Sequence, residues 1–123
     1  MSVKLLVVED DKNLNLMLQL ILNRRKLNWE FRSARDGIEA LDILEKYPAD
    51  MAMVDLEMPR MGGLELIRNI KARPEWAKLK IAVLSSSDDQ TLKDNVRAAG
   101  VTNIWMKPIF PEVLFSRITA VLG

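Results

Sequence analysis

The sequence predicts an α/β fold with a doubly wound parallel sheet, in which five strands alternate with five helices. Two observations predict it: short aliphatic runs of strand length, and intervening segments whose apolar residues recur at helical spacing. Such alternation implies parallel strands, right-handed crossovers and helices on both faces of the sheet. The length of 123 residues suits one domain over residues 1–123, and we find no repeat, low-complexity segment or linker in it.

The five predicted strands cover residues 4–8, 29–34, 51–55, 81–84 and 104–106. In the second strand, large apolar and polar residues alternate, which indicates a partly exposed strand near an edge of the sheet. The third strand is the most informative, because its apolar residues end abruptly at Asp55 and Pro59 follows soon after. Proline cannot continue a strand ladder, so Asp55 is predicted where a buried strand passes into a loop.

Each predicted helix carries one apolar stripe that would face the sheet. The stripes fall within residues 14–22, 38–44, 64–70, 92–99 and 114–122. Pro48 and Pro74 are predicted to end the second and third helices, and Gly100 the fourth. The last helix is predicted to begin near Pro111.

The composition excludes several kinds of chemistry. The chain has no cysteine and no histidine, which rules out disulfides, thiol catalysis and Ser-His-Asp catalysis, and removes the usual zinc ligands. Catalysis would have to come from carboxylates, hydroxyls, lysine, arginine or a hard oxygen-bound metal. The net charge is +1, from 18 basic and 17 acidic residues, so we expect no direct binding of nucleic acid and no membrane binding.

The chain is expected to be cytoplasmic. Its first residues run directly into a predicted strand rather than into the apolar segment of a signal peptide. No apolar run approaches the length of a membrane span.

Polar residues follow the carboxyl ends of four predicted strands: Glu9, Asp10 and Asp11 the first, Asp55 the third, Ser85 the fourth and Lys107 the fifth. The carboxyl ends of parallel strands lie along one edge of a sheet, so we expect these groups to meet there. Crowded carboxylates repel, and oxygen-only ligands favour Mg²⁺, with Mn²⁺ or Ca²⁺ as alternatives. Taken singly, each residue has a simpler explanation, as a helix cap or as a surface lysine.

Taken together, these groups fit one reaction. A carboxylate can attack phosphorus and form an aspartyl phosphate, and the charge that develops on the phosphoryl oxygens needs to be neutralised. In such a site Asp55 would be the nucleophile, Mg²⁺ and Lys107 would supply positive charge, and Ser85 would donate its hydroxyl.

The chain resembles the receiver domain of two-component response regulators over essentially its whole length. The resemblance rests on five short motifs that are specific as a set: residues 7–11, residues 55–59 with Gly63, residues 84–86, Ala-Gly at 99–100 and Lys-Pro at 107–108. It implies a flavodoxin-like sheet with strand order 2-1-3-4-5. It also implies either a stand-alone chemotaxis-type regulator or the N-terminal receiver of a longer protein.

The resemblance implies a role for each residue that would contact the phosphoryl group. Asp55 would be the phosphoacceptor, Lys107 would pair with a phosphoryl oxygen, and the Ser85 hydroxyl would turn toward the group. The peptide bond between Lys107 and Pro108 would be in the cis form.

The resemblance also implies a set of ligands for Mg²⁺, with Mn²⁺ as an alternative. Asp10, Asp55 and the backbone carbonyl of Glu57 would bind the ion directly, and Glu9 would act mainly through water. Asp11 is an additional acid outside this set.

The sequence departs from the family pattern at one position. Receivers commonly place Tyr or Phe midway along the fifth strand, where the ring takes part in the switch. That position here is Ile104, with Trp105 next to it. An aliphatic side chain cannot swing a ring or a hydroxyl in the same way, so the usual aromatic rotation is not expected here. Trp105 is predicted to pack in the core or against the last helix rather than to act as a signal.

The predicted function is a phosphorylation-dependent signalling switch, not an enzyme, although it would catalyse its own phosphorylation and slow dephosphorylation. The donor would be a sensor histidine kinase or a phosphotransfer protein, because the chain has no histidine. Phosphorylation would change the surface of the fourth helix, fifth strand and fifth helix. An unidentified protein or a fused output domain would read that surface.

Three other functions stay open at this point. One is a receiver-like module that binds protein without phosphate. Another is an aspartyl-phosphate phosphatase, for which the chain has no room for a substrate cap. The third is flavodoxin-like cofactor binding, which fits poorly because the loop after the first strand is acidic.

Overall fold

Five parallel strands form one sheet at the centre of the computed structural model, which describes residues 2–58 and 60–123. The strands are β1 (Lys4–Val8), β2 (Glu30–Ala34), β3 (Met51–Asp55), β4 (Lys80–Ser85) and β5 (Asn103–Met106). Their order across the sheet is β2-β1-β3-β4-β5, as the resemblance implied. Each neighbouring pair is parallel, which confirms the predicted fold class. Pro59, the predicted signal for the end of β3, lies outside the described residues.

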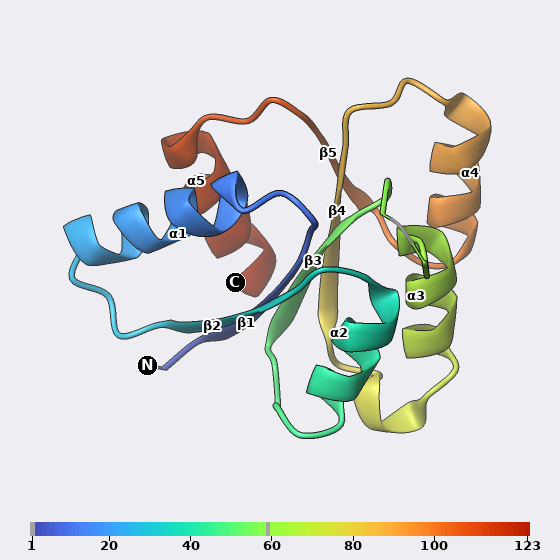
Figure 1. The fold of residues 1–123 in the computed structure, drawn as a ribbon, viewed down its shortest axis with the longest axis horizontal. Coiled ribbons are helices and arrows are strands. Elements are labelled where there is room, and N and C mark those ends of the chain that lie inside the picture. The colour runs from blue at the N-terminus through green and yellow to red at the C-terminus, as the bar shows by residue number, and fades with distance from the viewer. Residues whose placement is uncertain (1, 59) are drawn as a thin grey trace.

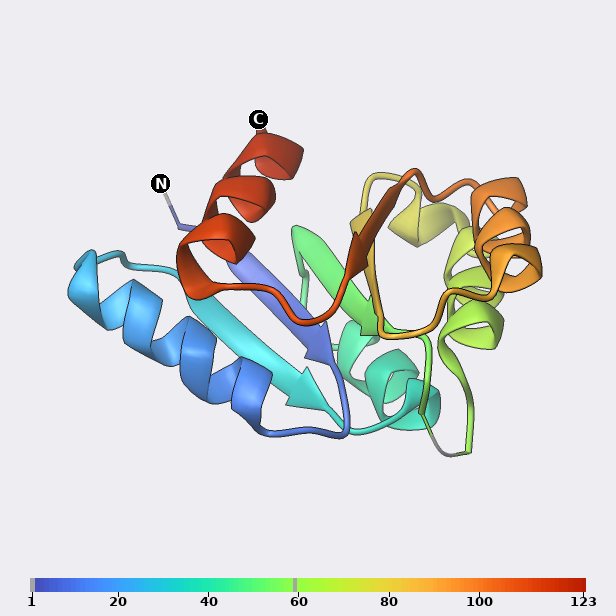
Figure 2. The same ribbon diagram turned by 90° about the horizontal axis from the view of Figure 1, so that it is seen from above.

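Five helices cover the two faces of this sheet (Figure 1). They are α1 (Asn13–Arg24), α2 (Gly37–Leu44), α3 (Gly63–Lys71), α4 (Gln90–Ala98) and α5 (Pro111–Leu122). Figure 2 shows α1 and α5 on one face and α2, α3 and α4 on the other. Within the described part of the chain, none of the helices is both long and apolar enough to cross a bilayer.

A short 3-10 turn, η1 (Pro74–Trp76), follows α3 and was not predicted from the sequence. The prediction that α3 ends before Pro74 is confirmed. Proline occupies the first turn of η1, where its missing N–H leaves no helical hydrogen bond unmade.

The central strand β3 separates two apolar layers and is buried along its whole length. Ala52 and Val54 face the layer under α2, α3 and α4, whereas Met51 and Met53 face the layer under α1 and α5. A strand covered on both faces is expected to be continuously apolar. Asp55 is the residue that breaks this pattern, at the carboxyl end of the most enclosed strand.

The two edge strands match their sequence patterns. β2 is largely exposed and lies at one edge of the sheet, as its alternation predicted. At the other edge, Trp105 of β5 is buried against Leu114 and Ile118 of α5. Ile104 packs against the opposite layer and is partly buried. The prediction that Trp105 lies in the core is therefore confirmed.

Candidate functional site

Asp55 lies at the carboxyl end of β3, between β1 and β4. Its side chain is only 6% exposed. One carboxylate oxygen, Oδ1, accepts a hydrogen bond from the backbone N–H of Glu57 at 3.1 Å, and the other, Oδ2, lies 3.3 Å from Nζ of Lys107. The carboxylate is therefore enclosed, yet it contacts groups that follow other strand ends.

Gly63, the first residue of α3, allows this helix to begin close to Asp55. A Cβ atom at position 63 would lie 2.6 Å from the Asp55 carbonyl oxygen and 2.8 Å from Cα of Leu56. Side chains do not fit at such distances, so the close approach of loop and strand requires glycine here.

Lys107 connects the ends of three strands. Its backbone N–H donates to the Ser85 carbonyl at 2.9 Å, directly beyond the paired residues of β4 and β5. Its ammonium nitrogen lies 2.5 Å from Oε1 of Glu9 and 3.3 Å from Oδ2 of Asp55. Burial opposes the charged form, but the two carboxylates raise the pKa of Lys107 above its ordinary value. The bond between Lys107 and Pro108 is cis, as the resemblance implied.

Ser85 ends β4 and is 1% exposed. Its hydroxyl donates to Oε1 of Glu57 at 2.8 Å, and it accepts the backbone N–H of Ser87 at 3.1 Å. The hydroxyl thus reaches Asp55 only through the Glu57 carboxylate in this structure. This contact between Ser85 and the Glu57 side chain was not predicted, because only the Glu57 carbonyl had been assigned a role.

Glu9 and Asp10 follow β1 and differ sharply in exposure. Glu9 is 5% exposed, and its Oε2 atom is buried without a hydrogen-bond partner among the described residues. Asp10 is exposed in the loop that leads to α1, and none of the hydrogen bonds or ion pairs of the described residues involves its side chain. Glu9 therefore contacts the site directly through Lys107, whereas the Asp10 side chain is exposed beside it.

The carboxylates of this site outnumber the cations beside them. Burial, and next the neighbouring Glu57 carboxylate, raise the pKa of Asp55 from 3.8 to about 6, even though Lys107 opposes the shift. For Glu57, burial works against ionisation, but hydrogen bonds with Ser85 and Asp55 hold its pKa below the ordinary value. The two carboxyls can share a hydrogen bond only while one of them keeps its proton, so full ionisation places two like charges side by side.

These observations fit the chemistry of a hard divalent cation. Crowded carboxylates and a buried, unpartnered carboxylate oxygen are suitable ligands for Mg²⁺. Among residues 2–58 and 60–123, no group of three His, Cys, Asp or Glu residues is arranged to hold a metal. The predicted set does not require one, because its direct ligands are Asp10, Asp55 and a backbone carbonyl, and Mg²⁺ usually retains several waters.

Comparison with known proteins decides the family. The family model of the response regulator receiver domain matches residues 5–119. The chain belongs to this family. Membership of the receiver family implies phosphorylation-dependent signalling in a two-component system. The strand order of the sheet agrees with this membership.

Individual relatives of the receiver are similar over nearly its whole length. It is 31% identical over 121 residues to a chemotaxis protein CheY homolog of Campylobacter jejuni, covering 98% of this chain and 92% of that protein. It is 34% identical over 122 residues to response regulator MprA of Mycobacterium bovis, covering 99% of this chain but 51% of that protein. The structure of chemotaxis response regulator CheY4 of Vibrio cholerae superposes with a TM-score of 0.87 at 27% identity, covering 98% and 99% of the two chains.

Sequence reasoning missed a second group of contacts near the receiver's site. Arg60, in the loop between β3 and α3, forms an ion pair with Asp36, which precedes α2. The sequence Asp36-Gly37 by itself indicates only a turn. No local pattern links residues 36 and 60, so only the fold could reveal this pair.

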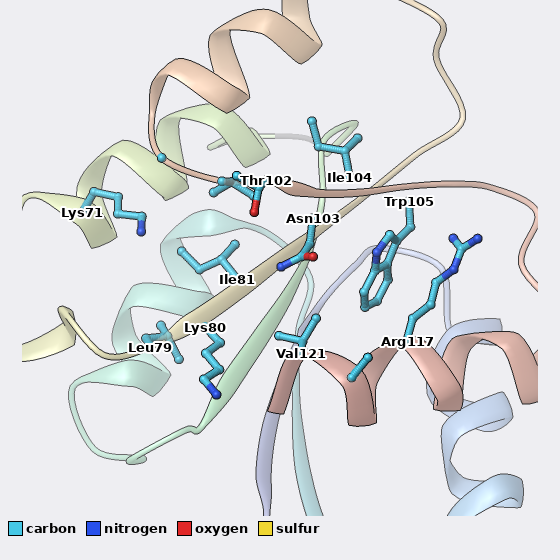
Figure 3. Close-up of a pocket in the computed structure, with 13 residues that line it drawn as sticks. Lys71, Leu79, Lys80, Ile81, Thr102, Asn103, Ile104, Trp105, Arg117 and Val121 are labelled. Carbon is cyan, nitrogen blue, oxygen red and sulfur yellow. The ribbon is translucent and has the colours of Figure 1, made fainter. Parts of the chain in front are cut away.

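The receiver also has a groove away from Asp55, along the edge strand β5 (Figure 3). Its volume is about 650 Å³, and the basic residues Lys71, Lys80 and Arg117 line it, whereas no acidic residue does. Figure 3 shows Trp105 between Asn103 and Arg117. The groove therefore presents positive charge beside β5 and α5.

Proposed function

We propose that this receiver accepts a phosphoryl group on Asp55 from a phosphohistidine of a sensor histidine kinase or phosphotransfer protein. The observation that carries the proposal is the buried contact between Asp55 Oδ2 and Lys107 Nζ at the carboxyl edge of the sheet. An Asp55 oxygen would attack phosphorus, and the P–N bond would break with its electron pair remaining on the donor imidazole. These 123 residues contain no histidine, so the phosphohistidine would lie outside them; a small acyl or amido phosphate could replace it.

The residues of the site have complementary parts in this transfer. Asp55, with a pKa of about 6, is mostly ionised at neutral pH and so available as a nucleophile. Lys107 would neutralise charge on a phosphoryl oxygen. Asp10, Asp55 and the Glu57 carbonyl, with Glu9 acting through water, would hold Mg²⁺ or Mn²⁺. When bound, the ion supplies further positive charge to the transferring oxygens.

The proposed response to phosphorylation begins with Ser85 and Lys107. Each donates to a carboxylate in this structure, Ser85 to Glu57 and Lys107 to Glu9. A phosphoryl group on Asp55 would compete for both donors, because it adds a charge of about −1.5 to −2 and three acceptor oxygens. Since the two residues end adjacent strands, we expect the change to reach the surface formed by α4, β5 and α5.

We propose that a downstream protein, or an output domain in a longer chain, reads this surface. The basic groove along β5 favours a partner that presents acidic side chains, since Lys71, Lys80 and Arg117 line it and, among the described residues, no acid does. A cytoplasmic location and the absence of direct nucleic-acid or membrane binding stay predictions.

Labelling tests the phosphoacceptor. The purified chain is incubated with acetyl phosphate and Mg²⁺, and incorporation of one phosphoryl group is followed by intact-protein mass spectrometry. We expect labelling of the native chain, none in Asp55→Asn, and strong reduction in Asp10→Asn. The control is Asp42→Asn, which changes an exposed acid on α2 and should be labelled like the native chain.

Three results would contradict the proposal. Undiminished labelling of Asp55→Asn would place the phosphoryl group on another residue. Rapid multiple turnover of acetyl phosphate, with little phosphoprotein accumulating, would indicate a phosphatase. No labelling under any condition, together with unchanged binding of a partner, would indicate a module that works without phosphate.

A further inference from the structure

The loop between β3 and α3 is fastened at a point away from Asp55. Arg60 of this loop reaches Asp36, whose Oδ2 atom lies 2.7 Å from Nε and 2.5 Å from Nη2 of the guanidinium group. Next to this ion pair, the backbone N–H of Gly37 donates to the Met61 carbonyl at 3.1 Å. A side-chain ion pair and a backbone hydrogen bond therefore connect the loop to the start of α2.

Asp36 is a fixed partner for Arg60. Its side chain is 7% exposed, and its Oδ1 atom accepts the Glu39 N–H at 3.0 Å as the N-cap of α2. This N–H has the largest effect in holding the pKa of Asp36 below its ordinary value; Arg60 adds to it, and burial opposes it. Asp36 thus carries its charge at neutral pH and is held by the helix that it caps.

Arg60 reaches this partner through an uncommon backbone conformation. Its φ angle is +60°, in the left-handed region that side-chain-bearing residues rarely adopt. Such a conformation persists where surrounding contacts impose it. The ion pair with Asp36 is one such contact at residue 60.

The other end of the same loop is fastened to the reaction site. The Glu57 N–H donates to Asp55 at 3.1 Å, and the Glu57 carboxylate accepts the Ser85 hydroxyl at 2.8 Å. The loop is therefore held at residue 57 by the site and at residue 60 by α2. The carbonyl of Glu57 lies between these two points of attachment along the chain.

We propose that Asp36 and Arg60 form a positioning pair, which sets the loop that carries the Glu57 carbonyl and thereby raises the affinity of the receiver for Mg²⁺. The inference rests on the proposed function, because it takes the Glu57 carbonyl as a ligand. Mg²⁺ demands near-ideal octahedral geometry and tolerates little displacement of a ligand. An ordinary ion pair with a half-exposed arginine would contribute little to folding and nothing to metal affinity.

Two substitutions remove the ion pair with residue types that still suit the backbone conformation at each position. Arg60→Asn keeps a residue that tolerates the left-handed conformation, but its side chain is too short to reach Asp36. Asp36→Asn keeps an N-cap for α2 but loses the negative charge. The control is Arg35→Ala, which removes a neighbouring exposed ion pair with Glu39, 3.4 Å long, and leaves the loop untouched.

The dissociation constant for Mg²⁺ is measured by isothermal titration calorimetry, and thermal unfolding is followed separately in EDTA. We expect Mg²⁺ to bind about 10-fold more weakly to each single variant, which is the lower end of the range seen when a group that supports a metal ligand is replaced. The double variant should bind Mg²⁺ no more weakly than the single variants, because each single substitution already removes the same contact. Arg35→Ala should bind within about twofold of the native chain, and unfolding in EDTA should change little.

The outcomes separate this inference from the function on which it rests. Near-native Mg²⁺ affinity in both single variants, with no Mg²⁺ binding by Asp55→Asn, would overturn the positioning pair alone. A fall in Mg²⁺ affinity matched by a large loss of stability in EDTA would also overturn it, because the pair would then act on the whole fold. Native Mg²⁺ binding by Asp55→Asn would overturn the proposed metal site and this inference together.

Discussion

Replacing Asp55 by asparagine should stabilise the metal-free protein at pH 7.5, although the proposed function depends on this residue. Burial and the adjacent Glu57 carboxylate raise the pKa of Asp55 from 3.8 to about 6. One pKa unit corresponds to about 1.36 kcal/mol, so ionisation of Asp55 destabilises the folded state by about 3 kcal/mol. Asparagine turns one acceptor oxygen into a donor near Lys107, and we allow about 1 kcal/mol for that contact. The expected net gain is about 2 kcal/mol.

The gain should depend on pH with a defined sign. Below the ordinary pKa of 3.8, Asp55 is protonated in both the folded and the unfolded chain, so the substitution gains little. As the pH rises from there to about 6, the unfolded chain releases its proton first and the native protein loses stability relative to the variant. Above that range the difference should be constant.

Urea unfolding in EDTA, followed by circular dichroism at a series of pH values, measures this difference. Asp42→Asn, which alters an exposed acid on α2, should unfold like the native chain. Saturating Mg²⁺ should stabilise the native chain and not Asp55→Asn, since only the former retains the proposed ligand. If Asp55→Asn were as stable as the native chain in EDTA at pH 7.5, or less so, the crowded-carboxylate reasoning would be refuted.

Three further predictions concern other buried groups. Gly63→Ala should lower the free energy of unfolding by about 1–3 kcal/mol, because the added Cβ atom would overlap backbone atoms of Asp55 and Leu56. Gly62→Ala, whose added Cβ atom would have its nearest contact at 3.8 Å, should change the free energy of unfolding little in the same urea titration. Lys107→Met leaves the buried Glu9 carboxylate without its cation, so it should destabilise the protein at pH 7.5 in EDTA, by about 3 kcal/mol. Tyr47→Phe should be neutral or stabilising, since the buried hydroxyl has no partner among the described residues; burial raises the pKa of Tyr47, so the native chain alone should lose additional stability as the pH rises above 10.

The sequence was sufficient for the fold because local and long-range signals agree. Aliphatic runs alternate with helical stripes along the chain, and β3 is apolar from Met51 to Val54, as expected of a strand covered on both faces. The turn η1 was missed because proline signals the end of one helix and the start of another equally well. The order of the strands came from the family resemblance, since alternation alone leaves it open.

The site was predictable only as far as one residue at each strand end. Parallel strands bring their carboxyl ends to one edge, and this is why Glu9, Asp55, Ser85 and Lys107 could be grouped from sequence alone. Which atoms touch could not be predicted in the same way. The Ser85 hydroxyl donates to the Glu57 carboxylate because of the path that the loop after β3 takes. That loop has no periodic sequence pattern from which the contact could have been predicted. The contact between Arg60 and Asp36 has the same origin.

Under the proposed function, the hydrogen bonds of this site offer a route for a switch that does not use an aromatic residue at position 104. Ser85 is held by the Glu57 carboxylate at 2.8 Å, and Lys107 by Glu9 at 2.5 Å and by Asp55 at 3.3 Å. A dianionic phosphoryl group on Asp55 would attract both donors more strongly. The N–H of Lys107 is bonded to the Ser85 carbonyl at 2.9 Å, so a shift of either residue is transmitted to the other. Under the proposed function, the coupling between β4 and β5 would lie in their backbone pairing, and the signal would reach α5 without rotation of Ile104.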